Sequence, residues 1–347
     1  MLQLSCEIEI EGEKFDYVGE VQILSSWKTL TDTATIKVPR NLISRNKMKL
    51  NDKVAVGHKV SIKLGYNLEP SLRFKGYVDA IGAATNEMEI KCQDDMWLLK
   101  KGSYTCSWKN ASIDDVVGFI KDSYQLKFEH ETLGDFVSLG QWKVEGLSGA
   151  KILQKLKDDF GIGSFFRNGI LVLGKPYETK VDAKKEISFA YGQNVITWKD
   201  LTYRDKKDIK LKTRLINMKP NGTKEESIKG DDDGEERTLH FYNLSKTDLD
   251  KQAEALIERM KYSGYRGKLT AFGIPAVAHG NVAVIKDYRT PDREGKYFID
   301  SVETTFSNGG NTATPAMAAT CNSSNTPIMP KPPLLLIMRS CNIVKPS

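Results

Sequence analysis

The first hundred residues alternate between apolar and polar side chains in several short runs. An alternation with a period of two is typical of strands that bury one face. It predicts strands over residues 2–10, 15–25 and 32–39, and it continues through "LRFKGYVDAIG" and "EMEIKCQD". Residues 1–104 are therefore predicted to form an antiparallel β unit, either a small barrel or a closed sandwich.

The apolar period changes to that of helices within residues 105–180. Ser112 is expected to cap a helix, with Asp115 in the capping-box position. A second helix is expected to begin near Ser148, and "SFFRNGILVLG" predicts a hairpin that turns at Asn168-Gly169. This segment is predicted to be a small α+β domain inserted between two β units.

Strand patterns return in residues 181–315, beginning at "EISFAYGQNVITWKDLTYR". The clearest helix of the chain is predicted over residues 245–262, where leucines and other apolar residues recur on one face. The charged stretch between Pro220 and Thr238 predicts a surface loop or a long hairpin tip. Residues 181–315 are thus expected to be a second β-barrel domain that carries one helix.

The composition shifts in residues 316–347, which are rich in Ala, Asn, Ser, Thr and Pro. Near the end of this proline-rich tail stands an apolar run that contains Leu334, Leu335, Leu336 and Ile337. Two interpretations are open. The tail folds back on its own barrel, or it is a docking segment for a neighbouring protein.

One hairpin pattern occurs twice. "GHKVSIKLGYNLEPSLRFKGYVDAI" (57–81) resembles "HGNVAVIKDYRTPDREGKYFIDSV" (279–302). The matched positions are Val60 and Val282, Ile62 and Val284, Tyr66 and Tyr288, and Tyr77 and Phe298. Many antiparallel hairpins share this pattern, so the hairpins alone leave duplication open. Together with the domain pattern, they predict a mainly β protein of two similar antiparallel β-barrel domains plus a small α+β domain.

The composition is that of a globular protein. The chain has 347 residues, 40% hydrophobic and 28% charged, and no apolar run approaches the length that spans a bilayer. The N-terminus has no basic or apolar leader pattern, so we expect cytoplasmic synthesis and no membrane partner. The net charge of +6 is spread along the chain, whereas a dedicated nucleic-acid binder concentrates its basic residues.

Motifs for catalysis or metal binding do not stand out. Five cysteines are widely spaced without CxxC, and the four histidines form no HExxH. The sequence also contains no GxSxG, P-loop or GxGxxG. We therefore expect no catalytic residues, no metal ligands and no cofactor, although the sequence alone would not reveal a pair of carboxylates brought together by folding.

The order of these segments resembles the baseplate hub proteins of phage tails, the late-control D and tail-hub family related to the N-terminal part of type VI secretion spike proteins. The resemblance lies in "GHKVSIKLGY…LRFKGYVDAIGAATNEMEIKCQDDMWLLKK", in "GLSGAKILQKLKDDFGIGSFFRNGILVLG", and in "FGIPAVAHGNVAVIKD…GKYFIDSVETTFSNGG". It covers residues 1–315. The usual histidine of the family's closing phrase "V-x-H-x-F" is replaced by Thr304.

The resemblance implies a structural hub without enzymatic activity. Three chains with two barrels each would form a homotrimeric pseudo-sixfold ring between a hexameric tail tube and a trimeric spike. The two hairpins, with Val60, Ile62, Tyr66, Tyr77, Val282, Val284, Tyr288 and Phe298, would help to build the ring wall. The apolar tail would reach the spike or another baseplate protein, and DNA would pass through the lumen without specific binding. The implied location is the virion tail baseplate, assembled in the host cytoplasm.

Two other functions are weighed against the hub. A tail-tip cell-wall hydrolase would need a catalytic module, yet every segment is already used by the barrels and the insert. A glycan- or receptor-binding module would use exposed aromatic residues, for which Trp108, Trp142 and Trp198 are the candidates. Each of these tryptophans lies in or beside an apolar pattern, which favours packing inside the protein.

Overall fold

A computed structural model describes residues 3–47, 49–83, 86–133, 139–174, 186–261, 264–291, 294–307, 316–322 and 335–338 of the chain.

The first β unit is built from one strongly bent sheet. Its strands are β1 (Leu4–Ile10), β2 (Glu13–Phe15), β3 (Glu20–Ser26), β4 (Thr33–Pro39), β5 (Lys59–Tyr66), β6 (Glu69–Ala83) and β7 (Glu87–Gln93). They lie in the order β3-β4-β7-β6-β5-β1-β2. The long strand β6 pairs first with β5 and then, past a bulge between Val78 and Ala80, with β7. The bulge bends β6 so that it passes from one layer of the unit to the other.

The core of this unit lies between its two layers. Alternate residues of each strand point inward, as the burial of Ile8 in β1, Ile36 in β4, Ile62 in β5 and Ile90 in β7 shows. The predicted period-two strands of the first unit are thereby confirmed.

The second β unit has two separate layers. Its strands are β13 (Glu186–Ala190), β14 (Val195–Arg204), β18 (Gly264–Phe272), β19 (Val282–Lys286), β20 (Gly295–Ile299), β21 (Ser301–Ser307), β22 (Ala316–Asn322) and β23 (Leu335–Met338). One layer has the order β14-β18-β22-β21 and the other β13-β19-β20-β23. Strands β20 and β21 are separated only by Asp300, at the place where β6 has its bulge. The core between the layers includes Phe189, Leu269, Ile285 and Tyr297.

The two units share one strand order. In the first unit it is β3-β4-β7-β6-β5-β1, and in the second it is β14-β18-β22-(β21/β20)-β19-β13. All matched neighbours are antiparallel except the last pair, because β13 runs parallel to β19 whereas β1 runs antiparallel to β5. The predicted mainly β fold with two similar units is confirmed, with this one change of direction.

The predicted hairpin alignment is correct in its second strand and one residue out of register in its first. The backbone N–H of Gly57 donates to Val78 and that of Gly280 donates to Ile299, which makes Val78 and Ile299 equivalent. Tyr77 then faces Lys59, and Phe298 faces Val282, so Lys59 rather than Val60 corresponds to Val282. A bulge between Ile62 and Lys63, which the β19–β20 pairing lacks, separates the two registers from there on.

The first α+β unit follows the first β unit through the short helix η2 (Asp95–Leu99). It contains β8 (Tyr104–Ala111), α1 (Ile113–Tyr124), β9 (His130–Leu133), β10 (Gly140–Leu147), α2 (Gly149–Phe160), β11 (Ser164–Arg167) and β12 (Ile170–Gly174). The capping box of Ser112 and Asp115, the Ser148 cap and the Asn168-Gly169 hairpin turn are all confirmed.

A second α+β unit corrects the prediction of a surface loop or a long hairpin tip between Pro220 and Thr238. Strands β15 (Leu211–Met218), β16 (Lys224–Gly230) and β17 (Glu235–Tyr242) form a sheet, and α3 (Lys246–Met260) packs on it. In β16 and β17 the apolar side chains are too sparse to predict strands, because one sheet face is polar and carries cross-strand ion pairs such as Arg214 with Glu226. The predicted helix over residues 245–262 is confirmed as α3.

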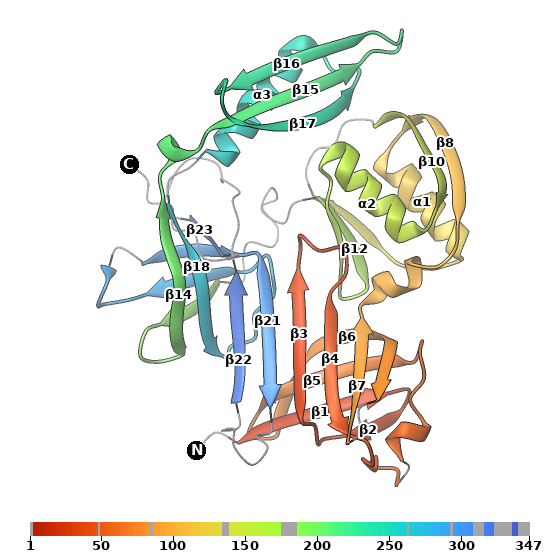
Figure 1. Cartoon of the computed structure of the whole chain (residues 1–347), viewed down its shortest axis with the longest axis vertical. Coiled ribbons are helices and arrows are strands. Elements are labelled where there is room, and N and C mark those ends of the chain that lie inside the picture. The colour runs from red at the N-terminus through yellow and green to blue at the C-terminus, as the bar shows by residue number, and fades with distance from the viewer. Residues whose placement is uncertain are drawn as a thin grey trace.

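The β units lie side by side, and both α+β units lie beyond the same end of the shared sheet, as Figure 1 shows. The α+β units also touch each other. Tyr242 of β17 packs so closely on Gly140 of β10 that a Cβ at Gly140 would lie 2.0 Å from its ring.

We expect Gly76→Ala to lower the free energy of unfolding by about 1–3 kcal/mol, because a new methyl group must displace backbone. A Cβ on Gly76 would lie 2.0 Å from the Gln93 carbonyl oxygen. Gly82→Ala in the same strand is the matched control, since its nearest neighbour is 3.7 Å away. Denaturant unfolding measures both variants, and equal stabilities would contradict the close approach.

Candidate subunit interface

The joint between the two β units is a strand pair inside the chain. Strand β21 of the second unit pairs antiparallel with β3 of the first over seven positions, from Ser301 opposite Ser26 to Ser307 opposite Glu20. The pair fuses the units into one eleven-stranded sheet, whose strands β22, β21, β3 and β4 lie side by side in Figure 1. Because β3 and β21 satisfy each other's backbone groups, neither is a free edge.

A buried carboxylate fastens one end of this joint. Asp300 is fully buried beside β21, and its Oδ1 accepts a hydrogen bond of 2.7 Å from the indole Nε1–H of Trp27. The ammonium of Lys28 lies 3.3 Å from Oδ2. Trp27 and Lys28 follow directly after β3, so both partners come from the other unit. A buried charge needs such partners, and removal of one leaves it poorly compensated.

The first unit has the same arrangement within itself. Asp79 is the counterpart of Asp300, and it accepts hydrogen bonds from Trp97 Nε1 at 3.1 Å and from Gln93 Nε2 at 2.7 Å. Each β unit therefore places an aspartate at the bend of its central strand, where it receives an indole N–H.

The first α+β unit completes the joint. Arg167 donates to the carbonyl oxygen of His279 at 2.8 Å, and the Phe165 ring meets the His279 ring edge-on at 4.8 Å. Phe165 also belongs to an apolar cluster with Trp27 and Val282, so three units meet at one point. Burial, and secondarily the Arg167 charge, lowers the pKa of His279 to about 3, which keeps the imidazole neutral.

Two further carboxylates lie next to the β3–β4 turn, Asp94 buried and Asp32 half-buried. The Oδ2 of Asp94 accepts the backbone N–H of Asp32 at 3.0 Å, and Asp32 accepts from Ser25 Oγ at 2.5 Å. Burial raises the pKa of Asp32 to about 6. Burial and the nearby charge of Asp32 hold the pKa of Asp94 well above its usual range.

The hairpin residues predicted to build the ring wall differ in how exposed their side chains are. Val60, Ile62, Tyr66 and Val282 are buried within the chain, so their side chains build cores rather than an outer surface. Val284 is half-buried, as is Tyr77, whose ring stacks on Trp97 at 5.4 Å. Tyr288 is 71% exposed. The backbone of Phe298 pairs with Val282, and its side chain lies outside the described residues. Participation of the hairpins in a ring wall stays a prediction.

The apolar tail has its backbone in the chain's own second unit. Leu335, Leu336 and Ile337 belong to β23, which runs parallel to β20. Leu334 lies outside the described residues. This pairing is the arrangement of the fold-back interpretation, and contact of the tail with another baseplate protein stays a prediction.

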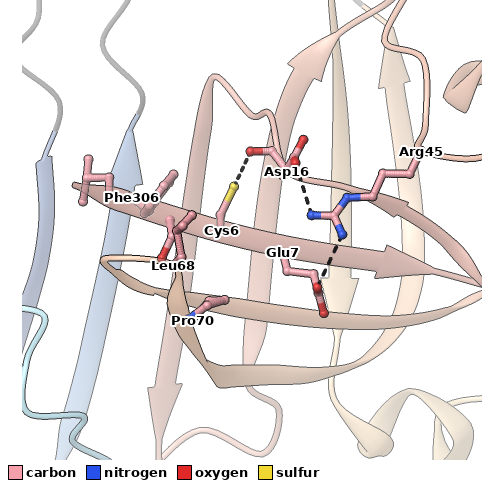
Figure 2. Close-up of a pocket in the computed structure, with 9 residues that line it drawn as sticks. Cys6, Glu7, Asp16, Arg45, Leu68, Pro70 and Phe306 are labelled. Carbon is pink, nitrogen blue, oxygen red and sulfur yellow. Dashed lines mark hydrogen bonds and ion pairs between the residues drawn. The ribbon is translucent and has the colours of Figure 1, made fainter.

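A shallow groove lies where β1 approaches the end of β21. Figure 2 shows that Phe306, Leu68 and Pro70 line one part of it, and that Cys6, Glu7, Asp16 and Arg45 line the other. Its volume is about 290 Å³. The Cys6 thiol donates to the Asp16 carbonyl oxygen, and burial raises its pKa to about 12. The thiol therefore stays protonated and is a poor nucleophile.

The described residues give little support for a metal site or for a sugar-binding surface built from tryptophans. Among them, no group of three or more His, Cys, Asp and Glu could hold a metal ion. Trp142 is buried and stacks on Trp108 at 5.8 Å, so the pair fills a core instead of forming an open sugar platform. The side chain of Trp198 lies outside the described residues. In the part of the chain that the structure describes, no helix is long and apolar enough to cross a membrane.

Sequence reasoning missed the joint itself. It aligned Asp79 with Asp300 within "YVDAI" and "FIDSV", but it gave the pair no role. A carboxylate repeated inside two apolar strands was the available signal, because such a group needs a buried partner. The partners do not occupy matching places of the repeat, because Trp27 follows β3 and Trp97 lies in η2.

Comparison with known proteins identifies the fold. No protein-family model and no curated protein matches the sequence. Among solved structures, a tail protein from Neisseria meningitidis is similar with a TM-score of 0.65 and 12% identity, over 92% of this chain and 95% of that one. The chain has the fold of phage tail proteins. The resemblance to tail-hub proteins is thereby confirmed at the level of the fold.

Two further solved structures share this tail-protein fold. The 43 kDa tail protein of prophage MuSo2 from Shewanella oneidensis has a TM-score of 0.56 and 14% identity, over 91% of this chain and 96% of that one. An E. coli component of the type VI secretion system has a TM-score of 0.59 and 12% identity, over 93% of this chain and 79% of that one. That component is described as structurally similar to the T4 bacteriophage tail proteins gp27 and gp5.

We expect Trp27→Phe to lower the free energy of unfolding by about 1–3 kcal/mol, because it removes a donor from a buried carboxylate. Trp108→Phe is the control, since its indole meets no carboxylate in the described part of the chain and the ring stack is kept. Thermal and denaturant unfolding compare the two variants. An unchanged Trp27→Phe protein would show that the Asp300 contact does not stabilise the joint.

The buried aspartates predict a fall in stability as the pH rises from 3.8 to about 6. In that window the unfolded chain releases the Asp32 proton while the folded chain retains it, so folding becomes less favourable. Asp32→Asn should flatten this part of the curve of unfolding free energy against pH. His279 acts in the opposite direction, since its lowered pKa reduces stability as the pH falls. The single variant therefore has to be compared with the wild type at each pH, and an unchanged slope would contradict the role of Asp32.

Proposed function

We propose that the chain is a structural hub of a phage tail or a phage-like injection apparatus. Three copies form a closed ring of six similar β units, between a tail tube of sixfold symmetry and a spike of threefold symmetry. The observation that carries the proposal is the strand pair β21–β3, which joins two units of the same strand order within one chain. A contact that already joins unit to unit in the chain can be repeated between chains.

The edges required for this repeat are present. Strand β14, the counterpart of β3, ends the described part of the large sheet. Residues Ala80–Ala83 of β6, the counterparts of the first part of β21, have β7 on one side and no other described strand opposite. One end of the molecule thus offers a β14 edge and the other a β6 edge. Contacts between two different surfaces close into a ring when the rotation between copies allows it.

The open face of the shared sheet suits the wall of a channel. Burial alternates along its strands, so each strand turns every second residue away from the core. On this face Lys37 pairs with Glu20 at 2.6 Å, and Gln22 bonds Glu303 at 2.7 Å. The Lys37–Glu20 pair compensates one basic group across the strands, and we propose that the wall as a whole offers DNA no concentrated basic surface. A polyanion such as DNA would pass along it without being held.

The two β units differ where a threefold partner would need them to differ. The connector from β4 to β5 covers residues 40–58, whereas its counterpart from β18 to β19 covers only 273–281. The β3–β4 turn is short, whereas a whole α+β unit stands between β14 and β18. In the proposed ring, the wall of β sheets therefore has nearly sixfold symmetry. The connectors and α+β units at its margins have only threefold symmetry. Tail tube, spike and other baseplate proteins are the proposed partners, and the virion baseplate, assembled in the host cytoplasm, is the proposed location.

The mass of the purified full-length chain tests this proposal. We expect native mass spectrometry and sedimentation velocity to detect a homotrimer, either for the protein alone or after addition of its cognate spike protein. Electron microscopy should show a ring with a central opening. A chain that stays monomeric under both conditions, or that degrades peptidoglycan as a monomer, would contradict the hub.

A further inference from the structure

We infer that Lys206 of one copy and Asp79 of the next form the ion pair that fastens each joint between chains. This inference rests on the proposed ring and specifies its contact. The in-chain joint serves as the template, because Lys28 and Asp300 form the corresponding ion pair at 3.3 Å between the two units of one chain.

Backbone hydrogen bonds establish which residues of the first β unit correspond to Asp300 and Val302. Gly57 and Gly280 donate to Val78 and Ile299, and both acceptor residues also donate back to the residue after the glycine. Asp79 is therefore the counterpart of Asp300, and Ile81 that of Val302.

The strand pairings also lead from Lys28, which follows β3, to its counterpart after β14. Neighbours across β7 and β22, β4 and β18, and β3 and β14 are matched in turn. The resulting equivalent residues are Lys91 and Asn322, Thr35 and Lys268, and, past the bulge between Lys199 and Thr202, Leu24 and Thr202. Counting four residues onward from Leu24 and Thr202, past the ends of both strands, makes Lys206 the counterpart of Lys28. Lys206 belongs to η3 (Lys206–Asp208), directly after β14, and its side chain is exposed.

The exposure of Ile81 shows that the β6 edge has an uncovered apolar position. Ile81 faces Ile90 of β7, which is fully buried, yet Ile81 itself is 37% exposed. Its counterpart Val302 is only 5% exposed. Val302 lies on β21, whose outer side is covered by β3. A β14 strand from a second copy, placed against Ala80–Ala83, would cover Ile81 in the same way.

Asp79 is half-buried, and its carboxylate accepts hydrogen bonds from Trp97 Nε1 and Gln93 Nε2, which leaves lone pairs for a further donor such as a lysine. Trp97 of the same chain already donates the indole N–H that Trp27 donates to Asp300. Among the described residues no lysine or arginine forms an ion pair with Asp79, whereas Asp300 has Lys28. Asp205, which stands in the place of Trp27, uses its side chain to accept the backbone N–H of Lys207. The partner of Asp79 in the assembled ring is thus the next residue, Lys206.

Charge reversal tests the pair on the full-length chain. We expect Lys206→Asp to raise the dissociation constant of the trimer by about tenfold or more, since it places like charges together at an interface. Lys207→Asp changes an adjacent exposed lysine by the same charge and should leave the constant unchanged. The double variant Asp79→Lys with Lys206→Asp should restore association. Sedimentation velocity over a concentration series measures all four proteins, and circular dichroism checks that each is folded.

Disulfide cross-linking gives an independent readout if the double variant does not fold. In a background with Cys106, Cys321 and Cys341 replaced by serine, Gly82→Cys chains mixed with Thr202→Cys chains should give covalent dimers on oxidation. Neither variant alone should do so. If Lys206→Asp leaves the dissociation constant of the trimer unchanged and the mixed chains give no cross-link, this inference is overturned. The hub proposal is not affected by that result. A wild-type chain that never associates, even with its spike, would overturn both.

Discussion

The structure depends on the need of every strand edge to pair its backbone groups. A β unit with an open edge exposes a row of N–H and C=O groups, and proteins either cover such a row or use it. Here β3 and β21 cover each other, and one layer of the second unit, β14-β18-β22-β21, joins the sheet of the first unit. The rest of the architecture follows from this pair, because it fixes the spacing of the two units and makes β14 and residues 80–83 of β6 the outer edges of the described layer.

Buried polar groups give the joint its specificity. Backbone pairing alone would tolerate a shift along the strands, since every register offers the same hydrogen bonds. Asp300 with Trp27 and Lys28 selects one register, because only there does the carboxylate have its partners. Arg167 and Phe165 add the α+β unit to the same point through His279. This unit therefore braces the joint between the β units as well as covering its own core.

Much of this fold could be predicted from the sequence, and the failures have physical causes. The strands of the first unit and the caps at Ser112 and Ser148 rest on local patterns, and these were correct. In the second α+β unit, β16 and the start of β17 were mistaken for a loop or hairpin tip, because the open sheet face carries charged pairs such as Arg214 with Glu226, which remove the period-two signal there. The hairpin register was one residue out because a bulge at Ile62 leaves no trace in residue type. The joint could not be predicted, since Trp27 and Asp300 are far apart in sequence and only the fold brings them together.

The most direct measurement is an electron cryo-microscopy map of the assembled protein at a resolution that separates strands. The account predicts six β units around a channel, with β14 of each copy lying beside residues 80–83 of the next, as β3 lies beside β21. A map in which the copies meet through other surfaces, with both of these edges open, would contradict it.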